Sequence, residues 1–264
     1  MKRSPFPFTE QSVLVHCITN EITNELLANA LLFVGAKPIM AEDPREFADL
    51  FEQTDSILLN LGRISPAKEQ ALKIASHMAT QPIVLDIVGV AASSLRLALS
   101  KELAVNATVV KGNISEMRSF CGLATKSRGV DGSPFDQQAA EMDELITALK
   151  KLPSTTTYLA TGPTDVIVQG ETVLLLENGV AELDSFTGTG DIVGALIASV
   201  LGAGYPSLEA TRLAVSYFNL CGEAAKKSLV QPMGLADFRQ ETCNQLSLLH
   251  QTCWQKQMKG KNYE

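Results

Sequence analysis

The stretch ILLNLGRISPAKEQALKIASHMATQPIVLD, residues 57–86, decides the fold of this chain. It opens with a short apolar run at 57–62 and closes with another at 82–86, and both runs are typical of buried strands. Between them, residues 65–80 have the amphipathic period of a helix, with Ser65 at the capping position and a proline directly after it. The stretch therefore predicts a strand, a helix and a second strand.

The same alternation continues along the chain. It predicts helices over residues 93–103, 115–121 and 135–151, strands over 107–113 and 155–161, and helices starting near Thr189, Ser207 and Gly234. The segment DVIVQGETVLLLENG predicts a hairpin that turns at Gln169–Gly170. We therefore expect a three-layer α/β/α fold with a central, mostly parallel sheet covered on both faces.

Composition and charge narrow the class of protein. With 264 residues, no repeat and no linker-like segment, we expect one domain over residues 1–264, with a frayed tail from about residue 255. A net charge of −7 argues against a nucleic-acid partner, because phosphate neutralisation needs clustered Lys and Arg. Five cysteines without CxxC spacing, no secretory signal and no long apolar run predict a cytoplasmic protein that does not enter a membrane.

The glycine-rich turn in DSFTGTGDIVGALIASV, residues 184–200, is a candidate catalytic element. Gly188 and Gly190 allow close backbone approach, and the amides at the start of the following helix form a site for an anion such as a phosphate. Asp191 would repel that phosphate unless it has a task, such as accepting the proton of an attacking hydroxyl group. The alternative is that Asp191 only stabilises the helix N-terminus, by about 0.3–1 kcal/mol.

Two further carboxylates follow predicted strands. Asp86 ends the run PIVLD, and Glu116 lies in VVKGNISE just after the next strand. Ligands of parallel sheets bind past the carboxyl ends of the strands, and Mg²⁺ is usually held by one or two carboxylates, waters and phosphates. The alternative for Glu116 is a residue of the first helical turn, with Asn113 as the cap. The chain lacks a Walker A motif, a zinc-type His/Cys cluster and a GxSxG nucleophile elbow.

Several blocks of sequence strongly resemble the hydroxyethylthiazole kinase family of thiamine biosynthesis. They occur in family order from residue 13 to about 203, and VHCITN with GAKPIMA is the most specific combination. The blocks are VHCITN, GAKPIMA, LLNLGRIS, VLDIVG, VVKGNISE, GVDG, LATGPTD and FTGTGD. The resemblance implies a ribokinase-like fold, ATP and Mg²⁺, and a homotrimer with substrate sites between neighbouring subunits.

The resemblance also implies roles for individual residues. Asn20 and the backbone of Met40 would contact 4-methyl-5-(2-hydroxyethyl)thiazole, and the amide of Gly188 would meet its hydroxyl group or the transferring phosphate. Asp191 would be the general base. The nucleotide would be contacted by Lys111, Thr161 and Gly190, and Mg²⁺ would be organised by Asp86 and Glu116. Without the family, the alternative for Asn20 is a turn residue, and the alternative for Met40 is ordinary core packing.

The sequence departs from the family pattern at several positions. Lys111 stands where arginine is common, so the charge is kept but the planar fork of donors is lost. Arg63 stands where a small polar residue is usual, and we hypothesise that it reaches a phosphate or a carboxylate.

Two other functions remain open from the residues. One is another small-alcohol kinase of the same superfamily, acting on a pyrimidine or a sugar. The other is a non-catalytic sensor of thiazole or nucleotide.

Overall fold

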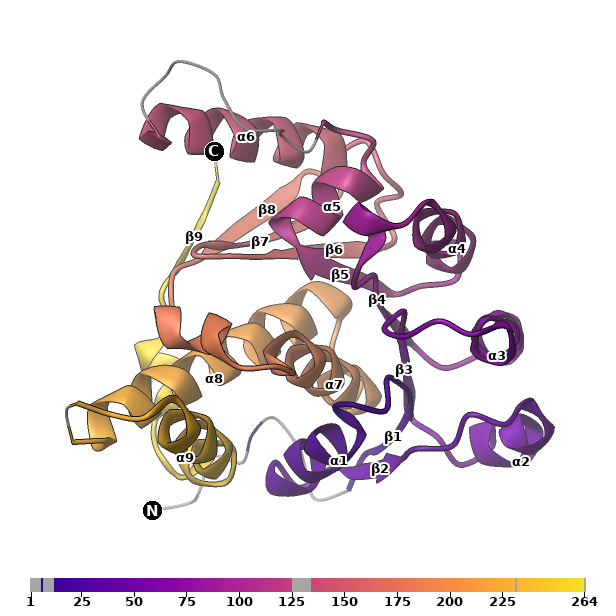
Figure 1. Ribbon diagram of the computed structural model, residues 1–264, viewed down its shortest axis with the longest axis horizontal. Coiled ribbons are helices and arrows are strands. Elements are labelled where there is room, and N and C mark those ends of the chain that lie inside the picture. Colours follow the sequence, from indigo (N-terminus) through magenta and orange to yellow (C-terminus); the bar gives the residue numbers. More distant parts are fainter. Residues whose placement is uncertain (1–5, 7–11, 125–133, 231, 264) are drawn as a thin grey trace.

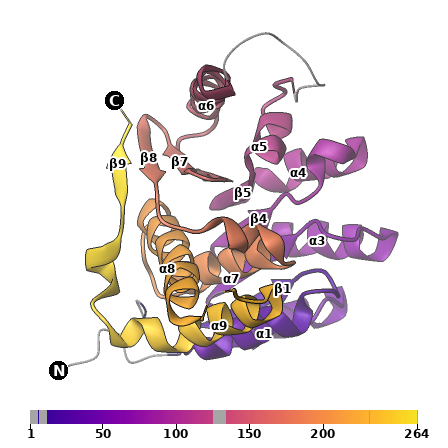
Figure 2. The same ribbon diagram turned by 60° about the vertical axis from the view of Figure 1, so that its left-hand side comes forward.

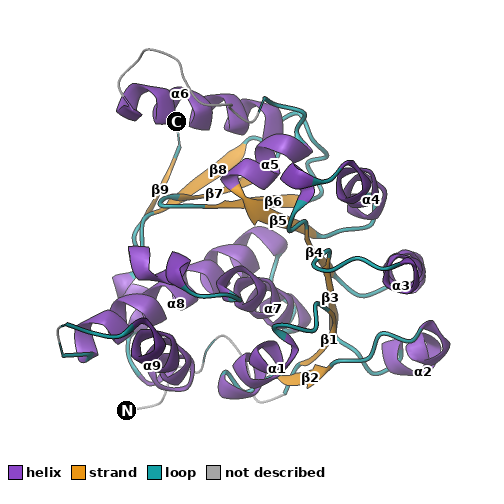
Figure 3. Cartoon of the chain, viewed as in Figure 1, coloured by secondary structure: helices purple, strands orange, loops and turns teal. Residues whose placement is uncertain are grey.

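A computed structural model describes residue 6 and residues 12–124, 134–230 and 232–263. For residues 134–139 it describes the backbone alone. The GVDG block at 129–132 lies outside the described residues. In the described part, nine strands form one sheet in the order β2-β1-β3-β4-β5-β6-β7-β8-β9 (Figure 3). The strands are β1 Leu14–Ile18, β2 Lys37–Ile39, β3 Ser56–Asn60, β4 Ile83–Asp86, β5 Val109–Asn113, β6 Thr157–Thr161, β7 Asp165–Gln169, β8 Thr172–Leu176 and β9 Gly260–Asn262.

The six strands from β1 to β6 are parallel, and β7, β8 and β9 continue the sheet as antiparallel neighbours. The turn between β7 and β8 contains Gly170 at a φ of 55°, a left-handed conformation that glycine adopts readily. The predicted hairpin is thus confirmed, and so is the mostly parallel sheet. The predicted strands at 57–62, 82–86, 107–113 and 155–161 correspond to β3, β4, β5 and β6.

Helices cover both faces of the sheet and complete three layers (Figure 1). The helices α1, α7, α8 and α9 pack on one face, and α2 to α6 lie on the other. The rotated view separates α8 and α9 from α3, α4 and α5 (Figure 2). They are α1 Asn24–Phe33, α2 Phe47–Phe51, α3 Pro66–Met78, α4 Ser94–Ala104, α5 Ile114–Phe120, α6 Pro134–Leu149, α7 Thr189–Gly202, α8 Ser207–Ser228 and α9 Leu235–Leu248.

Strand β3 shows why the sheet is buried on both sides. Successive side chains of a strand point to opposite faces, so Leu58 packs with α7 and α8 in one core cluster while Ile57 and Leu59 pack in the other. All three side chains are fully buried. A continuous apolar run, rather than an alternating one, is what a parallel strand between two helical layers requires.

Side-chain caps fix the starts of two helices that lead away from the sheet. Ser65 Oγ accepts the backbone N–H of Lys68 at 3.2 Å and so caps α3 as predicted. At the start of α5, Asn113 and Glu116 form a capping box in which each side chain accepts the other's backbone N–H at 2.8 Å. These caps place the residues after β3 and β5 at the edge of the sheet.

The end of the chain differs from the frayed tail expected from about residue 255. Trp254 is fully buried against Tyr217, and β9 pairs with β8 in an antiparallel ladder. Lys261 Nζ also lies 2.8 Å from Glu177 Oε1. Ladder hydrogen bonds and a buried indole compensate for the polar sequence, which alone indicates a solvated end. Within the described residues, no helix combines the length and the apolar character needed to cross a membrane.

Candidate active site

The carboxyl ends of strands β3 to β6 and the N-terminus of α7 surround a cavity of ≈ 400 Å³. Residues that follow the strands line one side of this cavity, and the turn from Thr187 to Asp191 lines the other. This is the edge of the sheet at which a parallel α/β fold binds its ligands.

Asp191 is held at this edge by three donors from the N-terminal quarter of the chain. Its Oδ2 accepts Thr23 Oγ1–H at 2.6 Å and Asn20 Nδ2–H at 3.1 Å, and its Oδ1 accepts Asn60 Nδ2–H at 2.9 Å. The residue is only 9% exposed. Hydrogen bonds to an ionised carboxylate are stronger than those between neutral groups, so the donors fix both the position and the orientation of the carboxylate.

Gly188, the residue before α7, has a backbone conformation and a tight packing environment that both favour glycine. Its φ of 101° lies in the left-handed region. A Cβ atom added there would lie 2.5 Å from Leu26 Cδ2, closer than Cβ atoms approach other atoms, and 3.1 Å from Thr23 Cγ2, which is a tight contact. The glycine thus lets the start of α7 approach α1 and the segment before it, which carries two of the donors to Asp191.

The first turn of α7 presents backbone N–H groups to the cavity. The first hydrogen bond into this helix joins Ile192 N–H to the carbonyl of Gly188 at 2.8 Å, so the amides before it have no partner within the helix. The helix dipole adds partial positive charge at the same place. The turn is therefore suited to bind an anion.

Lys111 and Asp86 form a buried ion pair beside this turn. They are register partners on β5 and β4, and Lys111 Nζ lies 2.6 Å from Asp86 Oδ2 with both side chains 3% exposed. Burial raises the pKa of Asp86 to about 6. Burial lowers the pKa of Lys111, but the charge of Asp86 and its hydrogen bond outweigh this and leave that pKa above its usual value. The opposite charge of Lys111 thus favours the ionised form of Asp86, and the charge of Asp86 favours that of Lys111.

Glu116 is engaged by backbone amides on both carboxylate oxygens. Oε1 accepts Gly89 N–H and Oε2 accepts Asn113 N–H, each at 2.8 Å. The capping alternative considered for Glu116 is thus part of the structure, yet the residue also lines the cavity together with Asp86. Within the described residues, no group of three or more His, Cys, Asp or Glu side chains is placed to hold a metal ion.

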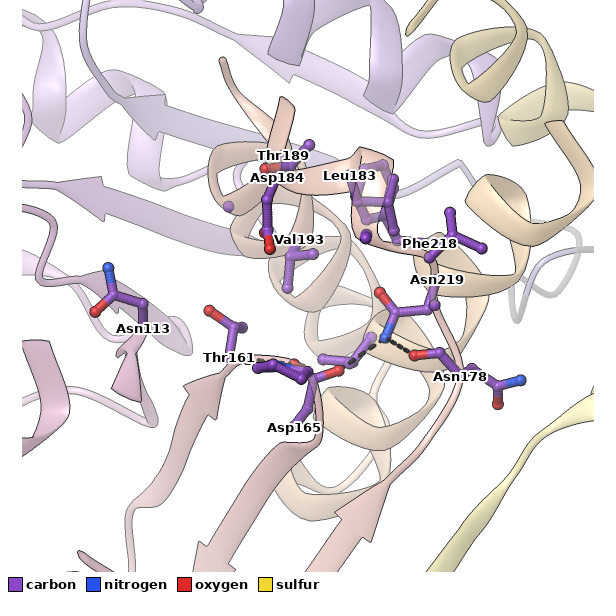
Figure 4. Close-up of a pocket in the computed structure, with 17 residues that line it drawn as sticks. Asn113, Thr161, Asp165, Asn178, Leu183, Asp184, Thr189, Val193, Phe218 and Asn219 are labelled. Carbon is purple, nitrogen blue, oxygen red and sulfur yellow. Dashed lines mark hydrogen bonds between the residues drawn. The ribbon is translucent and has the colours of Figure 1, made fainter. Parts of the chain in front are cut away.

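A second cavity of ≈ 310 Å³ adjoins the first (Figure 4). The two share Asn113, Thr161, Asp184, Thr189 and Gly190. Its inner wall is apolar at Val193 and Phe218 and polar at Asp165, whose Oδ2 accepts Asn219 Nδ2–H at 2.7 Å. Asn219 also donates to the carbonyl of Asn178 at 2.9 Å, as the dashed lines in Figure 4 show.

The structure brings all but one of the predicted site residues to the first cavity. Its lining includes the substrate-contact candidates Asn20 and Gly188, the general-base candidate, and all five residues predicted to bind nucleotide or metal, namely Lys111, Thr161, Gly190, Asp86 and Glu116. Met40 is not among the lining residues. It follows β2 and packs, half-buried, against the core cluster that includes α1 and α7. Arg63 lines the cavity and forms an exposed ion pair with Glu21.

Two of the three donors to Asp191, namely Asn60 and Thr23, have no role in the prediction from the sequence. Asn60 had a signal, because it ends a predicted strand at the ligand-binding edge. The only signal for Thr23 was its place three residues after Asn20, whose Oδ1 accepts the Thr23 backbone N–H at 3.1 Å.

Comparison with known proteins agrees with this architecture. The family model described as the hydroxyethylthiazole kinase family matches residues 7–252. The chain is 54% identical to hydroxyethylthiazole kinase of Enterococcus faecalis, over 97% of this chain and 96% of the relative. It is 51% identical to hydroxyethylthiazole kinase of Lacticaseibacillus casei, over 98% of this chain and 95% of the relative.

Solved structures show the same fold. Hydroxyethylthiazole kinase protein of Pyrococcus horikoshii superposes with a TM-score of 0.82 at 27% identity, covering 97% of this chain and 95% of that one. A ribokinase-like superfamily protein of Enterococcus faecalis reaches a TM-score of 0.59 at 16% identity, covering 92% and 89%. The predicted ribokinase-like α/β fold is confirmed, and the chain is a kinase that belongs to the hydroxyethylthiazole kinase family.

Proposed function

We propose that this protein, acting as one kinase domain over residues 1–264, transfers the γ-phosphoryl group of ATP to the primary hydroxyl group of 4-methyl-5-(2-hydroxyethyl)thiazole. The observation that carries the proposal is the placement of Asp191. Its carboxylate is fixed by three donors next to the amides of the first turn of α7, in one cavity with the Lys111–Asp86 pair. The identity of about half the residues to thiazole kinases supports the choice of substrate.

Asp191 acts as the general base, and Oδ1 is the oxygen that takes the proton. Oδ2 accepts two hydrogen bonds, from Thr23 and Asn20, whereas Oδ1 accepts one, from Asn60. A carboxylate oxygen has two lone pairs, so Oδ1 keeps one for the substrate. As the hydroxyl oxygen attacks the γ-phosphorus, its proton passes to Oδ1 and the bond to ADP breaks.

The phosphate being transferred is held by the turn and by Lys111. A Cβ atom built on Gly190 would lie 3.6 Å from Lys111 Nζ, so the ammonium group stands directly beside the amides of the turn. Fixed donors aimed at the negative charge that develops in the transition state lower the barrier to transfer. Gly188 contributes its amide at the same point.

A magnesium ion fits the carboxylates of this cavity. Asp86 Oδ1 and both oxygens of Glu116 accept one backbone N–H each, and each oxygen retains a lone pair. Mg²⁺ takes one or two protein carboxylates and completes its shell with water and phosphate oxygens, so these two residues would hold it. When bound, the ion neutralises charge on the β- and γ-phosphates.

The rest of the nucleotide occupies the second cavity. Thr161 and Gly190 line both cavities, which supports their proposed contact with the nucleotide. The mixed lining of apolar Val193 and Phe218 with amide side chains suits a base and a ribose.

We further propose that the protein is a cytoplasmic homotrimer in which the thiazole binds between neighbouring subunits, contacted by Asn20 and the backbone of Met40. The position of Met40 outside the cavity of a single chain supports a site that needs a second chain. Large apolar side chains are also exposed on and before α1, including Ile22 at 75% and Leu32 at 54%, and such groups favour an interface.

The test is ADP release from Mg·ATP with the thiazole, for the wild type and for Asp191→Asn. We expect the substitution to lower kcat by about 10²- to 10⁴-fold, the usual contribution of a general base, while thiazole binding persists. Asp237→Asn is the matched control, because Asp237 is likewise the third residue of its helix, α9, and is exposed. Thiazole binding without ADP release by the wild type would indicate a sensor. Full activity of Asp191→Asn would show that Asp191 is not the general base.

A further inference from the structure

Lys68 is a buried lysine in the first turn of α3, at the edge of the sheet that carries the site. The residue is 7% exposed. Its Nζ donates to the carbonyl of Thr19 at 2.6 Å and to the carbonyl of Gly62 at 2.8 Å. The ammonium group therefore joins the segment after β1 to the segment after β3.

Those two segments carry two of the three donors to Asp191. Asn20 directly follows Thr19, and Asn60 is the last residue of β3. The Oδ1 atom of Asn60 accepts the backbone N–H of Gly62 at 2.7 Å, which turns its Nδ2 toward Asp191. The orientation of the Asn60 amide thus depends on where the backbone of Gly62 lies.

The two segments touch at Gly62. A Cβ atom added to this glycine would lie 2.8 Å from Asn60 Oδ1 and 3.1 Å from Asn20 Cβ. Because the contact leaves no room for a side chain, a small shift of either segment changes how both amides meet the carboxylate.

A second cation, Arg96, also binds the loop after β3. Arg96 Nη1 donates to the carbonyl of Leu61 at 2.5 Å and to that of Val88 at 3.0 Å. The consecutive carbonyls of Leu61 and Gly62 are thus bound by two different positive charges. Charge-assisted hydrogen bonds of this kind are about twice as strong as neutral ones.

Burial of the Lys68 ammonium group is energetically unfavourable and therefore needs compensating interactions. Burial lowers the pKa of Lys68 to about 8, against the opposing charges of Glu42, Asp191 and Glu21 and with a smaller lowering from Arg96. A lysine that served only solubility would stay in water. The position of this one is explained by the two carbonyls that it binds.

We infer that Lys68 is a positioning residue for phosphoryl transfer: it holds the loops after β1 and β3 in the arrangement in which Asn20 and Asn60 reach Asp191. The inference rests on the proposed role of Asp191. It assigns Lys68 no contact with substrate or nucleotide, so loss of its ammonium group changes the chemical step more than it changes ATP binding.

A double-mutant cycle tests this inference. We expect Lys68→Met and Asn60→Ala each to lower kcat by about tenfold or more with little change in the KM for ATP, and the double variant to lose only about threefold beyond Asn60→Ala. Lys73→Met is the control, because Lys73 lies on α3 too but pairs with Glu69 at the surface. Its kinetics should match the wild type.

Multiplicative losses in the cycle, or a kcat of Lys68→Met within twofold of the wild type, would overturn the inference. Thermal unfolding checks that each variant is folded. If Lys68→Met does not fold, the same cycle is run with Lys68→Gln, whose amide still donates to one carbonyl, and the same outcomes decide.

Asp191→Asn is measured alongside to separate the two proposals. If Asp191→Asn stays active, the proposed general base is wrong. If Asp191→Asn loses activity but the Lys68 variant does not, only the positioning role of Lys68 is wrong.

Discussion

Asn60 Nδ2 donates to Asp191 Oδ1 at 2.9 Å and thereby joins the end of β3 to the start of α7. Both residues are at most 9% exposed, and Asn60 is fully buried. The bond connects a strand end with a helix start 131 residues away in sequence. Formation of the central sheet and docking of α7 are therefore both required before the proposed base is in place.

The hydroxyl group of Thr23 makes the shortest of the three bonds to Asp191, at 2.6 Å. Thr23→Val keeps the shape of the side chain and removes the donor, so the carboxylate loses a charge-assisted bond worth about 1.5–3 kcal/mol. We expect kcat to fall by roughly tenfold to a hundredfold, measured by steady-state ADP release. Thr54→Val removes a hydroxyl bond to the Leu50 carbonyl away from the cavity and should leave kcat unchanged.

Unchanged turnover in Thr23→Val, with the expected result for Thr54→Val, would show that Asn20 and Asn60 suffice to hold the carboxylate. The KM values for ATP and thiazole report whether the loss lies in binding or in the chemical step.

Substitutions of Gly188 and Gly204 by alanine distinguish two causes of lost stability, backbone strain and steric crowding. Both have a positive φ, 101° and 88°, but a Cβ atom at Gly188 would meet Leu26 at 2.5 Å whereas one at Gly204 would meet no atom within 4 Å. We expect Gly204→Ala to lower the free energy of unfolding by about 1–2 kcal/mol, the strain of a left-handed residue. Gly188→Ala should cost more, because Leu26 must also move, and should lower kcat. Urea unfolding and ADP release measure the two effects, and equal losses of stability would contradict the crowding argument.

Much of the fold can be predicted from the sequence because it rests on local patterns. The apolar runs and the capping residues Ser65 and Asn113 define β3, α3, β5 and α5, and each signal lies within about ten residues of the element it specifies. The hairpin turn at Gly170 is local in the same sense. The short strand β9 has no such pattern, because its pairing depends on the exposed edge that β8 presents.

The partners within the site depend on strand order, which is a property of the whole sheet. The glycine turn, its aspartate and the strand-end carboxylates can be selected from sequence by their chemistry. That Thr23 and Asn60 bind Asp191 follows only once β1 and β3 are neighbours beneath α7. Lys68 is the clearest example: in an amphipathic helix a lysine is expected on the solvated face, and only the fold places two carbonyls beside it.

Asp165 makes stability depend on pH. Burial raises its pKa from 3.8 to about 6, and the donors Gly162 N–H and Asn219 Nδ2–H lower it less. The folded state therefore binds the proton more tightly than the unfolded state, so this group contributes stability below about pH 4 that is lost as the pH rises through 6. The shift corresponds to roughly 3 kcal/mol.

We expect Asp165→Asn to remove this dependence. Relative to the wild type, its free energy of unfolding should decrease less between pH 4 and pH 7, by an amount on the order of 3 kcal/mol, in urea titrations at each pH. Asp49→Asn, on the exposed side of α2, is the control and should leave the pH profile as in the wild type. Parallel profiles for Asp165→Asn and the wild type would show that the carboxylate is not the source.

Lys111 and Asp86 should depend on each other for stability. Lys111→Met leaves the carboxylate buried without its cation, and breaking a buried pair in this way lowers the free energy of unfolding by about 3–5 kcal/mol. Adding Asp86→Asn removes the unpaired charge and should restore part of that loss, although the proposed metal ligand is then gone and activity stays low. The exposed pair of Lys261 and Glu177 is the comparison: Lys261→Met should change stability by no more than about 1 kcal/mol. Additive losses in the Lys111 and Asp86 double variant would contradict a coupled pair, because independent groups do not rescue each other.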